Sequence, residues 1–197
     1  MSVTARRFTA LACLVFACTA SAGVGAVDEA GVTGIVRVAG QPQKDVVVWL
    51  ERLDPAHAAR ERVTMDQRNL TFSPRVLAVR VGTSVTMPNN DKVFHNVFSF
   101  RDGKRFDLGL YPVGQSRRVT FDRPGVSRIF CNIHPNMTAY VVAVDSDYYG
   151  VSNAAGVVTM AAVPPGAYAY HAWRAGHEPV AGHVSVSVDR RMEFDLP

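Results

Sequence analysis

Residues 131–137 read Cys-Asn-Ile-His-Pro-Asn-Met and place a thiol, an imidazole and a thioether at intervals of three residues. The runs on either side, R-I-F before and T-A-Y-V-V-A-V after, have the composition of strands. We therefore expect Cys131, His134 and Met137 to lie on one tight loop between two strands. Sulfur ligands combined with imidazole select copper over magnesium, calcium or manganese.

A trigonal copper site with two histidines, one cysteine and a weak axial methionine fits this loop and requires one further histidine. His95, in the segment F-H-N-V-F-S-F at the start of an expected strand, is the candidate. Taken singly, such residues more often serve packing or lie on the surface. The pattern of all four together indicates one copper ion.

The chain lacks the residues that other metal sites and a cysteine nucleophile would require. A two-copper centre needs two cysteines, a multicopper oxidase needs paired H-x-H ligands, and structural zinc would not use methionine. A nucleophile built on Cys131 and His134 has no evident third group to orient it. The remaining histidines are expected to be surface residues and not ligands: His57, His171, His177 and His183.

The first 26 residues have the features of an export signal. Arg6 and Arg7 form a basic start, residues 8–17 form an apolar core too short to span a bilayer, and residues 20–22 read A-S-A, a small-x-small cleavage site. Residues 24–26 offer a second cleavage site, so the point of cleavage stays open. We expect a periplasmic protein without stable membrane insertion.

The 197 residues suffice for one or two small domains with a hydrophobic core, and 48% apolar residues argue against disorder. Without the leader the chain carries 19 basic and 17 acidic residues, an excess too small and scattered to indicate nucleic-acid binding. Cys131 is then the one cysteine left. An unpaired cysteine is a liability in an oxidising compartment, and metal binding would explain its presence.

Short strand-like segments with turn signals between them recur along the chain, almost without helical periodicity, and predict an all-β protein of sandwich type. Residues 54–62 are expected to form a short helix or a solvated connection, and residues 106–114 a loop. Two strands are expected between residues 31 and 51, and four towards the C-terminus: 157–161, 167–173, 184–188 and 192–196.

The segment from about Leu70 to Val144 resembles the cupredoxins, small blue-copper proteins, with an amicyanin-like loop. The matching features are V-R-V-G-T-S-V-T followed by N-N-D, H-N-V, and C-N-I-H-P-N-M. The resemblance implies a Greek-key sandwich that holds one type-1 copper ion. Its implied equatorial ligands are His95, Cys131 and His134, with Met137 axial.

The resemblance also implies that Asn96 supports the ligands without binding the metal. Its backbone N–H and side chain would tie the His95 strand to the Cys131 loop and form hydrogen bonds near the sulfur. The alternative is an ordinary turn residue.

The resemblance also implies a one-electron carrier, not an enzyme. It would meet a redox partner, a dehydrogenase or a cytochrome, through an apolar patch around His134. Two other classes of function stay open. One is a copper-binding or trafficking protein that passes no electrons, and the other is a partner-binding sandwich in which copper is structural.

The segments on either side resemble the carboxypeptidase regulatory-like, transthyretin-like sandwich through G-V-T-G-I-V-R-V and V-P-P-G-A-Y. We expect residues 31–62 and 146–197 to form this sandwich, with a cupredoxin domain at residues 63–145 inserted. The layout is similar to exported bacterial proteins labelled methylamine-utilisation-like, a label that does not establish a role in amine metabolism. The alternative is two sequential domains, with residues 31–62 extending the cupredoxin.

Overall fold

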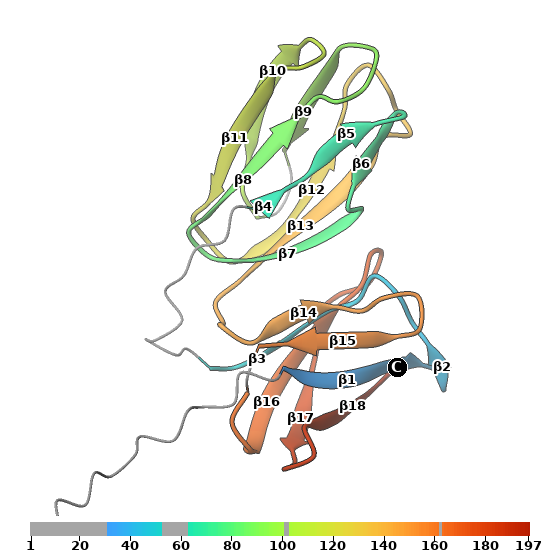
Figure 1. Cartoon of the computed structure of the whole chain (residues 1–197), viewed down its shortest axis with the longest axis vertical. Coiled ribbons are helices and arrows are strands. Elements are labelled where there is room, and N and C mark those ends of the chain that lie inside the picture. The colour runs from blue at the N-terminus through green and yellow to red at the C-terminus, as the bar shows by residue number, and fades with distance from the viewer. Residues whose placement is uncertain (1–30, 53–62, 101–102, 162) are drawn as a thin grey trace, which may run out of the picture.

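The computed structural model describes residues 31–52, 63–100, 103–161 and 163–197, and the statements below refer to these ranges. They form strands and turns without a helix, which confirms the all-β prediction, and no helix there could cross a membrane. Figure 1 shows two groups of strands: a central sandwich of β4–β13 at the top and a flanking sandwich of β1–β3 and β14–β18 below. The predicted export signal and residues 54–62 lie outside the described residues.

The central sandwich packs a five-stranded sheet against a three-stranded sheet. The larger sheet has the order β10 (Phe106–Tyr111), β9 (His95–Ser99), β12 (Gly125–Phe130), β13 (Thr138–Val144) and β7 (Val76–Arg80). The smaller sheet has the order β11 (Ser116–Phe121), β8 (Thr83–Pro88) and β4 (Val63–Thr64). A short hairpin of β5 (Asp66–Arg68) and β6 (Thr71–Ser73) completes the unit.

Period-two alternation builds the core between these sheets, because successive side chains of a strand point to opposite faces. In β8, Thr83, Val85 and Met87 are buried while the residues between them are half-buried. The same buried cluster takes in Cys131 and Met137 from the loop after β12. The predicted metal-binding loop is therefore anchored in the core through its two sulfur-containing side chains, Cys131 and Met137.

Residues 106–111, which were predicted to belong to a loop, form the edge strand β10, so this prediction was wrong. β10 pairs antiparallel with β9, and the register shifts between Asp107 and Leu110. Gly109 lies inside this bulge with a φ of 67°, a conformation that glycine adopts without strain. The bulge breaks the alternation by which the strand could have been recognised.

The flanking sandwich is assembled from both ends of the chain. One sheet contains β15 (Val157–Met160), β1 (Val32–Val38) and β18 (Arg191–Leu196), with β2 (Gln41–Pro42) beside β1. The other contains β14 (Tyr149–Val151), β3 (Val47–Leu50), β16 (Gly166–Trp173) and β17 (Val180–Val186). The strands near the N-terminus pair with C-terminal strands and do not extend the central sandwich.

A third hydrophobic cluster joins the two sandwiches. Trp173 of β16 is 5% exposed and packs on Tyr140 of β13, with ring centroids 5.1 Å apart. Arg80 at the end of β7 forms an ion pair of 2.6 Å with Asp147, whose side chain is almost fully buried. The outer face of the larger sheet is thus covered by the flanking sandwich along β13 and β7.

Replacing Trp173 with alanine tests this junction. We expect Trp173→Ala to lower the free energy of unfolding by about 3 kcal/mol, because a buried aromatic side chain leaves a cavity. Urea unfolding followed by circular dichroism measures the change. Val188→Ala, at a side chain that is 87% exposed, is the control and should alter stability by less than about 0.5 kcal/mol. Equal effects of the two substitutions would contradict the packing described.

Candidate metal centre

The loop between β12 and β13 meets the start of β9 at one end of the central sandwich. His95 is the first residue of β9, Cys131 directly follows β12, and His134 lies in the turn that leads to β13. Backbone hydrogen bonds close this turn: Met137 N–H donates to the His134 carbonyl at 2.9 Å, and Cys131 N–H donates to the Met137 carbonyl at 3.2 Å. The turn therefore holds cysteine and histidine in a fixed relation.

Three potential ligand atoms from these segments face one another. The Nδ1 atoms of His95 and His134 are 3.1 Å apart, and they lie 3.8 Å and 3.5 Å from Cys131 Sγ. A point equidistant from the three atoms lies about 2 Å from each, which is the length of a bond between a metal and imidazole nitrogen. Among the described residues this is the group of histidine, cysteine and acidic side chains that could hold a metal ion.

Met137 belongs to the same buried cluster as Cys131, is 1% exposed, and accepts the backbone hydrogen bond of Cys131. A thioether in the core cluster that contains the cysteine suits the weak axial position of a copper site. Its role as a ligand stays a prediction.

Burial separates the donors into two kinds. His95 is completely buried and Cys131 is 4% exposed, whereas His134 is half-buried. The rings of the two histidines meet edge to face with their centroids 4.8 Å apart. A metal held here would be shielded from water by His95 and Cys131, and its shortest route to the surface would pass through His134.

Asp91 orients the buried histidine and was not singled out from the sequence. Its Oδ2 lies 3.0 Å from His95 Nε2, so the ring N–H at Nε2 points to the carboxylate and the lone pair at Nδ1 is left for a metal. Burial would raise the pKa of Asp91, but hydrogen bonds from the backbone amides of Leu70 and Lys92 and from His95 outweigh it and lower the pKa to about 2. The carboxylate is thus ionised at neutral pH.

Asn96 has a different partner from the one predicted. Its Nδ2 donates to Asp107 Oδ1 at 2.7 Å, and the backbone N–H of Gly109 donates to the same oxygen at 2.8 Å. The Oδ1 atom of Asn96 is buried without a hydrogen-bond partner. The side chain therefore ties the His95 strand to the edge strand β10 and not to the Cys131 loop, because the bulge brings a carboxylate next to it.

A buried polar cluster supports the loop between β8 and β9. Tyr111, paired with His95 in the register of β10 and β9, donates its hydroxyl hydrogen to the Met87 carbonyl at 3.0 Å and accepts a hydrogen bond from Gln67. Burial raises the pKa of Tyr111 to about 12. Asn89 Nδ2 donates to the Val93 carbonyl at 2.9 Å. These contacts hold in place the loop that carries Asp91.

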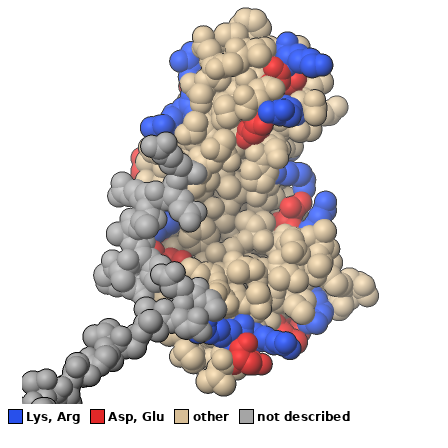
Figure 2. Space-filling model, viewed as in Figure 1, with Lys and Arg blue, Asp and Glu red and all other residues tan. Residues whose placement is uncertain are grey.

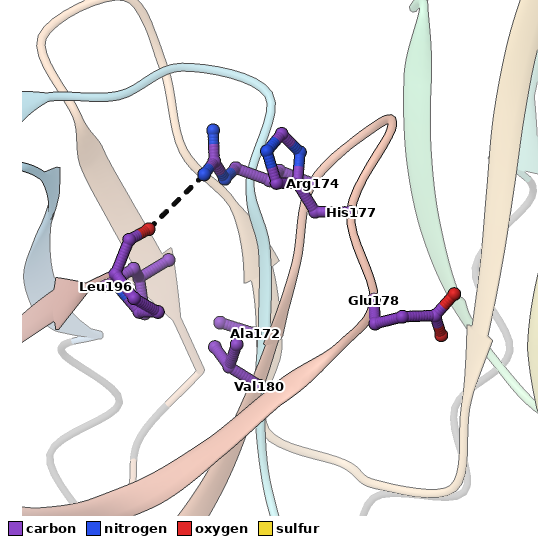
Figure 3. A pocket seen from close by; sticks show the side chains of 7 residues that line it. Ala172, Arg174, His177, Glu178, Val180 and Leu196 are labelled. Carbon is purple, nitrogen blue, oxygen red and sulfur yellow. Dashed lines mark hydrogen bonds between the residues drawn. The ribbon is translucent and has the colours of Figure 1, made fainter.

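The flanking sandwich carries the other described histidines, none of which joins a metal-binding group in the described ranges. His171 instead pairs with Glu51 at 2.6 Å. A pocket of the flanking sandwich is lined by Ala172, Arg174, His177, Glu178, Val180, Leu196 and Pro197 (Figure 3). There Arg174 donates to the Pro197 carbonyl at 3.3 Å, and Glu178 points away from the other labelled side chains. The pocket shows no convergence of ligand atoms. His57 lies outside the described residues.

Residues 59–144 match the family of copper binding proteins described as plastocyanin/azurin family. The match spans less than half of the chain and supports a cupredoxin domain in this part of it. Copper is the metal that both this match and the donor set of His95, Cys131 and His134 indicate.

Several solved structures are similar to part of the chain. A novel purple cupredoxin from Nitrosopumilus maritimus is 28% identical with a TM-score of 0.39, over 42% of this chain and 99% of its own. The Cu-containing nitrite reductase (NirK) from Thermus scotoductus SA-01 is 26% identical with a TM-score of 0.42, over 47% of this chain and 27% of its own. A reduced Cu(I) form of an amicyanin variant is 22% identical with a TM-score of 0.40, over 49% and 98%. No curated protein matches the chain significantly.

Removing the carboxylate behind His95 should weaken metal binding without removing a ligand. We expect Asp91→Ala to lower the affinity for copper by about 10- to 100-fold, because the buried ring loses the partner that fixes its orientation. Competition with a chromophoric chelator measures the affinity. Asp122→Ala, which breaks an exposed ion pair with Lys104, is the control. An Asp91→Ala affinity equal to that of the control would show that Asp91 does not position His95.

The link between Asn96 and Asp107 should contribute to stability even without metal. Asp107→Ala leaves the buried Asn96 amide unpaired, so we expect a loss of about 1–2 kcal/mol in the free energy of unfolding. Asp107→Asn retains an acceptor oxygen and should lose less. Urea unfolding of the metal-free protein compares the two variants. If both lost the same amount, the carboxyl oxygen would not be the feature that matters.

Proposed function

We propose that the protein is a periplasmic type-1 copper protein that carries single electrons between redox partners and is not itself an enzyme. The observation that carries the proposal is the convergence of two imidazole nitrogens and one thiol sulfur on a point shielded from water. We assign His95, Cys131 and His134 as equatorial ligands, Met137 as the axial ligand, and Asn96 and Asp91 as supporting residues.

The proposed chemistry follows from the residue types. A copper ion bound to one thiolate, two imidazoles and a weak thioether alternates between Cu(I) and Cu(II) and so stores one electron. The buried donors on β9 and beside β12 leave little freedom for the ligand set to rearrange when the charge changes. Rigid positioning of this kind suits rapid electron transfer.

Exposed apolar side chains on the segments that adjoin the donors support docking of a redox partner on the His134 face. Six of the exposed large hydrophobic side chains belong to the loops and strand ends near the donors, and we call them the apolar collar: Leu70, Val93, Phe94, Leu110, Val113 and Ile133. Ile133 lies between Cys131 and His134 in the chain. Clustered exposed apolar residues are typical of interaction sites. A small, transient interface would suit a carrier that must release its partner after transfer.

The domain organisation and location are part of the same proposal. We assign residues 63–145 to the cupredoxin domain and residues 31–62 with 146–197 to a carboxypeptidase regulatory-like sandwich. The pairing of β1 and β3 with C-terminal strands, and their shared hydrophobic cluster, support this division. The export signal predicted for residues 1–26 supports a periplasmic location. The similarity to methylamine-utilisation-like proteins leaves the donor and acceptor open.

Copper trafficking without electron transfer is the rival function. A trafficking site must pass its ion to another protein, which is easier when the thiol is accessible. Cys131 is 4% exposed and His95 is fully buried, which favours retention of the ion. A purely structural copper would in turn leave binding of a partner unchanged when the metal is removed.

Copper loading tests the proposed function directly. The protein with Cu(II) should show the intense visible absorption of a copper–thiolate bond, and voltammetry should show one reversible electron without release of copper. Cys131→Ser should abolish the colour, because the thiolate is lost, while His171→Ala, a histidine far from the donors, should retain it. A colourless copper complex of the unaltered protein would overturn the proposal. Release of copper on reduction would favour trafficking.

A further inference from the structure

Positive charge is concentrated in the part of the chain that contains the metal centre. Residues 63–145 carry eleven Lys and Arg residues but six Asp and Glu residues, whereas the mature remainder has an acidic excess. Between Leu108 and Val144 the single carboxylate is Asp122. It lies between β11 and β12, at the opposite end from Cys131, where it pairs with Lys104 at 2.7 Å.

The carboxylates near the metal end are all engaged in hydrogen bonds. Asp91 binds His95 and two backbone amides. Asp107 accepts hydrogen bonds from Asn96 and Gly109. Asp66 accepts one from Asn90 at 2.7 Å and pairs with Arg68 at 3.4 Å. Asp91 is thus committed to the donor His95, whereas Asp107 keeps its carboxylate at the surface on β10.

Two cations near the collar have no such partner among the described carboxylates. Lys92 is exposed and directly precedes Val93 and Phe94 of the collar. Arg117 is exposed near the start of β11, with its Cζ 5.7 Å from the centroid of the Tyr111 ring and only a long contact of 3.5 Å to Gln115. Figure 2 shows Lys and Arg groups on both sides of the upper part of the molecule, with Asp and Glu groups beside those on the right and a mostly uncharged surface between.

We propose that the apolar collar, flanked by Lys92 and Arg117, docks a redox protein whose contact face carries an excess of carboxylates around an apolar centre. This inference rests on the proposed electron-carrier function and adds the sign of the partner's charge. Opposite charges at the rim of an interface accelerate encounter and orient the partner, while the apolar centre makes the contact. Rim charges of this kind act mainly on the association rate and are screened by salt.

The first test needs no redox activity. Hexacyanocobaltate(III), a redox-inert trianion, should be titrated into the ¹⁵N-labelled metal-free protein while amide shifts are recorded by NMR. We expect the largest salt-sensitive shifts at residues 91–94 and 115–118. Shifts centred instead on Arg105 and Arg123, which line an open basic hollow at the other end of the central sandwich, would overturn the assignment.

The second test uses the copper-loaded protein and two small one-electron oxidants of opposite charge. Ferricyanide takes one electron from the reduced protein and becomes ferrocyanide, and tris(phenanthroline)cobalt(III) takes one and becomes cobalt(II). Raising the ionic strength from about 10 mM to about 150 mM should slow the ferricyanide reaction at least threefold and should not slow the cobalt reaction. The reverse pattern would overturn the proposal.

Two double variants separate local from overall charge. Lys92→Glu with Arg117→Glu should slow ferricyanide about tenfold at low ionic strength. Arg105→Glu with Arg123→Glu changes the net charge by the same amount at the far end and should slow it less than twofold. Equal effects would show that only net charge matters. Lys92→Glu alone, which leaves the Tyr111 contact intact, should give an intermediate rate.

These experiments distinguish failure of the proposed electron-carrier function from failure of the proposed partner charge. If the protein is no electron carrier, neither oxidant reacts, whereas the hexacyanocobaltate shifts at Lys92 and Arg117 persist. If only the charge assignment is wrong, both oxidants react and their salt dependence does not differ in the expected direction.

Discussion

Convergence of three ligand atoms, two of them in the core, on one point is the constraint on which this structure depends. His95 Nδ1 and Cys131 Sγ lie in the core, 3.8 Å apart, and both face His134 Nδ1. Packing two imidazoles and a thiol this closely brings three electron-pair donors face to face. A positive ion between them would satisfy all three at once. The sandwich around them serves to hold these atoms together.

The surrounding strands fix the donors from several directions. β9 is held between β10 and β12, and His95 itself pairs with Tyr111 of β10. Asp91 fixes the orientation of its ring, and the backbone hydrogen bonds of the 131–137 turn set the distance from Cys131 to His134. Because each restraint acts through a different element, the geometry depends on tertiary packing as much as on the loop itself.

Much of this could be predicted because its signals are local. The spacing of Cys131, His134 and Met137, and the alternation in β8, β12 and β13, are visible in single segments. Other features arise only when segments meet. β10 was missed because a bulge interrupts its pattern, and the partner of Asn96 could not be foreseen because Asp107 reaches it across that bulge. Asp91 lies in a turn motif whose role depends on where His95 points.

The flanking sandwich covers one face of the five-stranded sheet and leaves the metal end of the central sandwich open. Trp173 and its neighbours cover the outer face along β13 and β7, and the ion pair of Arg80 with Asp147 fastens the same side. The collar lies instead at the end of the sandwich where Cys131 and His134 emerge. An approaching protein therefore meets apolar side chains and the half-buried imidazole there, without displacing the flanking sandwich. Electron transfer, the proposed function, weakens steeply with distance, so that proposal places the partner at this end.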